Sequence, residues 1–90
     1  MNVAQFRPEK GWNGWFTRYS APGAIPNGTR IMKVVYEEND MCKYGEMGIV
    51  LGSFDAPVPP VKIMYFVEWD KEPKKAVAIL DYKITALNRG

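Results

Sequence analysis

Residues 45–70, GEMGIVLGSFDAPVPPVKIMYFVEWD, predict two strands joined by a proline-rich loop. The second strand, Val61–Trp69, has the clearer pattern because apolar residues alternate along it. One face carries only apolar side chains, namely Val61, Ile63, Tyr65, Val67 and Trp69. The opposite face carries Lys62, Met64, Phe66, Glu68 and Asp70. We therefore expect the first face to line the core, and another segment to cover the middle of the second face.

The flanking segments extend this pair into a small sheet. Met47–Phe54 is expected to be a strand in which Gly48 and Gly52 mark a bulge or bend. Residues 55–60 are expected to form a loop, because their three prolines donate no ladder hydrogen bonds. Further strands are predicted at Arg30–Tyr36, Ala76–Leu80 and Ile84–Leu87, with a polar loop over residues 37–46. The predicted fold class is mainly β: one five-stranded antiparallel barrel over residues 30–90.

Residues 1–29 have a different character and form an aromatic-rich N-terminal arm, packed on the barrel or extending from it. Trp12, Trp15, Phe16 and Tyr19 follow the spacing of one helix face. Gly11, just before that span, and Gly14 within it argue against a helix, and Asn13-Gly14 could instead form the turn of a tight hairpin. Irregular or short-helical structure is slightly favoured over the hairpin.

Composition bounds the class of protein. The chain has 90 residues and a formal net charge of +2, with the excess of positive charge in the arm. It has no histidine, and its single cysteine, Cys42, can form no internal disulfide. With no long apolar run and no signal-peptide core, the sequence predicts a cytoplasmic protein that binds no membrane.

The layout from residue 28 onward resembles the SH3-like small β-barrels. The resemblance rests on the opening Gly28-Thr29-Arg30-Ile31, on the segment from Gly45 to Val50, and on Tyr65-Phe66-Val67-Glu68-Trp69. Val77–Asp81 and the closing apolar strand complete the pattern, which covers residues 28–88. This superfamily hosts many unrelated functions, so the resemblance implies a fold and no single activity.

Two branches of the superfamily are similar in layout. One is the barrel of nitrile hydratase beta subunits and their electron-transfer relatives, which implies a role in assembly and docking. The other is the plasmid-borne type II dihydrofolate reductase, in which a tetramer forms one central active pore. That family carries a V-Q-I-Y segment, where this chain has Val77-Ala78-Ile79-Leu80. Since Ala78 and Leu80 replace the Gln and Tyr, the reductase activity is not carried over.

The ionisable residues indicate no catalytic set, no metal and no cofactor. Without histidine, the commonest general base is absent and Cys42 has no partner to activate it. The acidic run Glu37, Glu38 and Asp40 lacks the glycine turn of a cation site. Glu68, Asp70 and Glu72 are interpreted as solvated charges at a strand end.

Three functions are carried forward. The preferred one is a non-catalytic module that docks to another protein or forms a homo-oligomer through aromatic surface: Trp12, Trp15, Tyr44, Phe54, Trp69 and Tyr82. The alternative is a small nucleic-acid-binding barrel that uses Arg7, Lys10, Arg18, Arg30, Lys33 and Lys43. The third is an enzyme whose site lies between subunits, as the reductase resemblance suggests. Trp69 also ends the core-facing series of its strand, so a role in the core competes with partner binding at that position.

Overall fold

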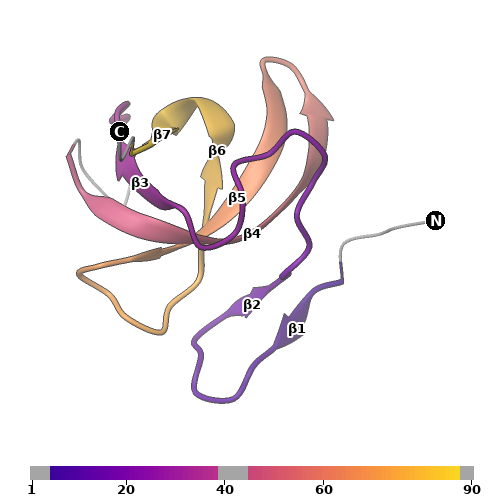
Figure 1. Cartoon of the computed structure of the whole chain (residues 1–90), viewed down its shortest axis with the longest axis vertical. Coiled ribbons are helices and arrows are strands. Elements are labelled where there is room, and N and C mark those ends of the chain that lie inside the picture. The colour runs from indigo at the N-terminus through magenta and orange to yellow at the C-terminus, as the bar shows by residue number, and fades with distance from the viewer. Residues whose placement is uncertain (1–4, 39–44, 88–90) are drawn as a thin grey trace.

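The computed structural model describes residues 5–38 and 45–87 and is mainly β, with no α-helix in those ranges (Figure 1). A two-stranded sheet pairs β1 with β2, and a five-stranded sheet has the order β6-β5-β4-β3-β7. The elements are β1 (Arg7–Pro8), β2 (Trp15–Phe16), β3 (Arg30–Lys33), β4 (Met47–Val58), β5 (Val61–Trp69), β6 (Val77–Leu80), the 3₁₀ helix η1 (Asp81–Lys83) and β7 (Ile84–Ala86).

The long β4–β5 hairpin forms the centre of the larger sheet, and β5 has the bounds that its alternation predicted. The expectation that the 55–60 segment leaves the sheet is wrong for residues 55–58, because β4 continues to Val58, which pairs with Val61. Pro57 lies at a shift of register between Asp55 and Val58, and Pro59 and Pro60 form the turn between the strands. A second shift lies between Val50 and Gly52, where a bulge was expected.

All five strands of the larger sheet contribute to one core. Its buried residues are Ile31, Val50, Tyr65, Val67, Trp69, Ile79 and Ile84. A sheet that places side chains from every strand in a single cluster must curl around that cluster. The hydroxyl of Tyr65 accepts a hydrogen bond from the backbone N–H of Ile25 at 2.9 Å, which ties the end of the arm to this core.

The predicted closure of the sheet into a barrel is not found in the described residues. β6 and β7 are the two end strands of the sheet, and neither pairs with the other. In the chain they are separated by η1. The last strand instead pairs with β3, where Ile84 lies opposite Lys33. β3 ends at Lys33 and is shorter than expected, although the N–H of Val34 still donates to the carbonyl of Lys83 at 2.8 Å.

The arm contains a β-hairpin, so the favoured irregular or short-helical interpretation is wrong. Arg7 pairs with Phe16, and Pro8 with Trp15. Gly11 and Gly14 have φ of 86° and 100°, a left-handed conformation that cannot continue a helix. The alternative of a hairpin was correct in kind, but the turn spans residues 9–14 and is longer than the expected two-residue turn at Asn13-Gly14.

The hairpin covers the outer face of β4 and β5, as the pattern of Val61–Trp69 required. Phe16 is fully buried and forms a second core cluster with Leu51 and Phe66. Phe6 adds edge-on ring contacts to Phe54 and Phe66, with centroids 5.2 and 5.3 Å apart. The central hairpin is therefore buried on both faces, by the curled sheet on one side and by the arm on the other.

Gly52 is the point at which the arm comes closest to the sheet. A Cβ at this position would collide with the backbone carbonyl of Thr17. The next residue secures the approach, because the N–H of Ser53 donates to the carbonyl of Tyr19 at 2.7 Å. The Ser53 hydroxyl in turn accepts from the N–H of Ala21 at 2.9 Å. The register of the arm on the sheet is therefore set by backbone contact, with little room for adjustment.

We predict that Gly52→Ala destabilises the fold by about 2–3 kcal/mol, since backbone atoms of Thr17 and Arg18 occupy the space that the new methyl group needs. Urea unfolding measures the effect. The matched control is Gly23→Ala, where nothing lies within 4 Å and only the left-handed backbone opposes the side chain. That strain costs about 1 kcal/mol. Equal losses for the two variants would contradict the close approach.

Candidate functional site

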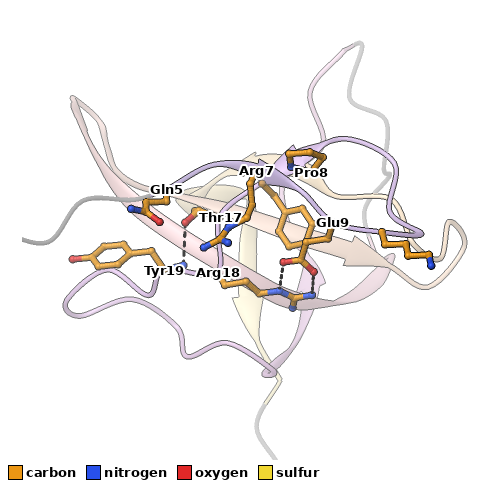
Figure 2. A pocket seen from close by; sticks show the side chains of 9 residues that line it. Gln5, Arg7, Pro8, Glu9, Thr17, Arg18 and Tyr19 are labelled. Carbon is orange, nitrogen blue, oxygen red and sulfur yellow. Dashed lines mark hydrogen bonds and ion pairs between the residues drawn. The ribbon is translucent and has the colours of Figure 1, made fainter.

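A pocket of about 530 Å³ lies against the arm, lined by both halves of its hairpin (Figure 2). The first half contributes Arg7, Glu9 and Lys10, and the second half contributes Thr17 and Arg18. Gln5, Pro8, Phe16 and Tyr19 complete the lining. Its charged groups are thus three cations and one carboxylate, which makes the pocket electropositive.

The carboxylate is held in a two-pronged ion pair. Arg18 donates from Nε and Nη2 to the two oxygens of Glu9 at 3.0 and 2.9 Å (Figure 2). Hydrogen bonding by Arg18 lowers the pKa of Glu9, and the positive charges of Arg7 and Lys74 act in the same direction. The same bonds raise the pKa of Arg18. A bidentate pair fixes the orientation of both groups, so it clamps the two strands of the hairpin together.

Arg18 is also supported by aromatic rings. Its guanidinium carbon lies 4.9 Å from the ring centroid of Phe16 and 5.6 Å from that of Trp12. Lys74 approaches the Trp12 ring to 4.9 Å. Trp12 is half-buried, and its ring centroid lies 5.2 Å from that of Phe16. Trp12 is thus engaged by two cations and a phenyl ring, and acts mainly as a support for the hairpin.

The six predicted nucleic-acid contacts divide into different environments. Arg7, Lys10 and Arg18 share the pocket. Arg30 forms its own bidentate pair with Asp70 at 2.8 and 2.7 Å, and hydrogen bonding between them lowers the pKa of Asp70. Lys33 is fully buried. Lys43 lies outside the described residues. The described cations therefore do not form one continuous basic track.

The predicted aromatic contacts are also scattered. Trp15 is the most exposed, with 64% of its surface accessible, whereas Trp69 is fully buried in the core and cannot reach a partner in this structure. Phe54 packs against Phe66 beneath the arm. Tyr82 is 40% exposed, and its hydroxyl lies 3.4 Å from both carboxylate oxygens of Glu37. Tyr44 lies outside the described residues. Neither tryptophan of the arm lines the pocket, but Trp12 contacts Arg18 and Trp15 pairs with Pro8, and both of these partners line it.

A smaller hollow of about 300 Å³ is lined by Ile49, Glu68, Trp69, Asp70 and Pro73. The indole N–H of Trp69 is buried nearby and has no hydrogen-bond acceptor among the described residues. Because the Trp69 ring is itself inaccessible, this N–H cannot donate to a molecule in the hollow without movement of the core.

Most of the acidic groups considered as solvated charges have structural partners. Glu37 forms an ion pair with buried Lys83 at 2.9 Å. Glu68 accepts the backbone N–H of Lys74 at 2.9 Å, and Asp70 holds Arg30. Within residues 5–38 and 45–87 no three acidic or cysteine side chains gather closely enough to hold a metal ion. Asp40 and Cys42 lie outside those ranges.

Sequence reasoning missed Glu9, Gln5, Pro8 and Tyr19 as parts of this pocket. Glu9 pairs with Arg18, nine residues away, across a hairpin loop whose length no local pattern specified. Pro8 becomes recognisable only from the strand register, which sets it opposite Trp15. The uneven charge of the arm was the one usable signal, because it grouped Arg7, Lys10 and Arg18 before their positions were known.

No family model matches the chain, and neither the curated proteins nor the solved structures contain a significant match to it. Among the described residues, no helix is long and apolar enough to cross a membrane. The site is therefore interpreted from its own geometry.

We predict that Glu9→Gln flattens the acid side of the stability profile. The folded-state pKa of Glu9 is lowered, so its ion pair stabilises the fold at neutral pH and is lost as the pH falls through that value. The wild type should lose stability between about pH 5 and about pH 3, and the variant should lose less. Urea unfolding across this range measures both slopes.

Glu38→Gln, at an exposed position away from the pocket, serves as the control and should keep the wild-type slope. Other carboxylates, Asp70 among them, will retain part of the fall in every variant. If the two variants followed the same profile, the Glu9–Arg18 pair would contribute nothing to stability.

Proposed function

We propose that this protein is a non-catalytic interaction module that docks a protein partner, or a second copy of itself, through the exposed face of its N-terminal hairpin. The observation that carries the proposal is Trp15. Trp15 exposes 64% of its surface, although the next residue in the same strand, Phe16, is fully buried. An exposed tryptophan on an anchored strand loses little freedom on binding, and tryptophan is enriched among residues that dominate interface energies.

The surroundings of Trp15 fit this role. Pro8 lies opposite it in the hairpin register, is itself exposed, and also lines the pocket. An apolar pair therefore borders an electropositive hollow, which combines a hydrophobic contact with polar groups that can fix orientation. Anchoring by Gly52, Ser53 and the buried Phe16 holds this arrangement in place before any partner arrives.

We further propose that the body is an SH3-like barrel whose two ends approach without pairing. The support is the strand order, in which β7 returns beside β3, together with η1 between the last two strands. A single core fed by all five strands is also what a small barrel requires. The fold by itself indicates no activity, so the functional proposal depends on the hairpin and not on the barrel.

Nucleic-acid binding is the second candidate, because Arg7, Lys10 and Arg18 gather on one face. The observations support nucleic-acid binding less well than they support a protein partner. Arg30 and Lys33 are engaged elsewhere, and the carboxylate of Glu9 lies within the same hollow as the three cations. Proteins that bind single strands without sequence preference use a continuous basic groove along the phosphate backbone and stack bases on aromatic rings. The described cations form no such continuous groove.

We predict that Trp15→Ala weakens partner binding at least about tenfold while leaving the fold intact. Peptides selected from a random display library against the purified protein provide the ligands, and sedimentation velocity tests for a second copy. The matched control is Val58→Ala, which removes another highly exposed apolar side chain, at the far tip of the β4–β5 hairpin. It should bind as the wild type does.

Two results would contradict the proposal. One is a set of selected peptides whose affinity is the same for the wild type and Trp15→Ala. The other is a protein that selects no peptide and stays monomeric at about 100 µM, a concentration that reveals even weak self-association.

A further inference from the structure

The pocket beside Trp15 contains two cations that the fold does not use. Arg7 and Lys10 are both exposed, and neither side chain forms a hydrogen bond or ion pair with any described residue. The other described arginines differ, since Arg18 is paired with Glu9 and Arg30 with Asp70. Within residues 5–38 and 45–87, folding thus leaves these two positive charges without a partner at one hollow.

The same hollow already holds one carboxylate in the way that an external one would be held. Glu9 takes both prongs of Arg18, and Arg18 in turn rests on Phe16. Arg7 is close enough to Glu9 for its charge to favour the ionised form of that carboxylate. A second carboxylate in the pocket would therefore enter a positive field and find the five-donor guanidinium of Arg7 uncommitted.

We propose that this pocket binds an acidic segment of a protein partner. Arg7 grips one carboxylate with two hydrogen bonds, Lys10 supplies a second positive charge, and an apolar neighbour in the segment packs on Trp15. The inference rests on the proposed function and specifies the chemistry of the partner that the hairpin recognises.

Charge and size favour an acidic protein segment over a nucleic acid. The volume of about 530 Å³ suits one or two side chains and provides no extended track for a backbone. A carboxylate side chain can bind Arg7 while its backbone stays clear of Glu9, whereas a strand of closely spaced phosphates would bring several charges near that carboxylate. The Pro8–Trp15 pair, of which Pro8 lines the pocket, offers an apolar contact that protein side chains can use.

Three probes, each of ten residues, test the assignment with the whole chain. They are a decapeptide of alternating glutamate and leucine, its glutamine counterpart, and a single-stranded thymidine decamer. Two-dimensional ¹H–¹⁵N NMR titration reports where each probe binds and how tightly. The acidic peptide should shift the resonances of residues 5–19, whereas the glutamine peptide should bind more weakly. The effect should diminish with added salt.

Variants then assign the contact to the two rim cations. Arg7→Gln and Lys10→Gln should each weaken binding of the acidic peptide by about three- to tenfold, as expected for the loss of one charge-assisted contact. Lys62→Gln is the matched control, because Lys62 is an exposed cation on β5, outside the pocket. Thermal unfolding should be unchanged in all three variants, since none of these side chains forms an ion pair with the described residues.

Each contrary outcome has a distinct meaning. Tighter binding of the thymidine decamer at residues 5–19 would replace the acidic segment with a nucleic acid. Equal binding of the glutamate and glutamine peptides, dependent on Trp15, would overturn the charge assignment and leave the interaction module standing. Equal weakening by Lys62→Gln and Arg7→Gln would show diffuse attraction with no site. Failure of all three probes would overturn the acidic assignment, and the peptide selection separately decides the proposed function.

Discussion

The pairing of β4 with β5 is the constraint on which the rest of the structure depends. β5 is buried on both faces over its central residues, with Tyr65 and Val67 in one core and Phe66 in the other. A strand of this kind needs a cover on each side, and ninety residues allow few ways to supply two covers. The curled sheet is one cover and the arm is the other, so the arm is an integral part of the fold and not an appendage.

The position of the pocket follows from how the arm meets that strand pair. The missing side chain at Gly52 lets the backbone at Thr17 approach, and the hydrogen bonds of Ser53 then fix the register over Tyr19 and Ala21. Phe16 is held beneath, which leaves its neighbour Trp15 on the outside. The burial of Phe16 and the exposure of Trp15 therefore have the same cause, because neighbouring side chains on a strand point to opposite faces.

The sequence predicted the sheet better than the arm. The alternation of β5 was sufficient to give its bounds, its core face and the need for a cover on the other face. The structure of the arm was harder to predict, because its aromatic residues have the spacing of a helix face although they belong to a hairpin. Gly11 and Gly14 carried the contrary signal. Barrel closure and the Glu9–Arg18 pair depend on distances between remote segments, which no local pattern contains.

The role of each charged side chain in this protein becomes clear only from the folded structure. A net charge of +2 in 90 residues is unremarkable, and six cations chosen from the sequence looked equivalent. Arg18 and Arg30 form bidentate ion pairs that position the segments they join. Lys33 is buried. Arg7 and Lys10 are left at a hollow beside an exposed tryptophan. A charged side chain that already forms ion pairs within the protein gains little from a partner. We therefore expect binding to depend on the charged side chains at the pocket that have no such ion pair among the described residues, Arg7 and Lys10.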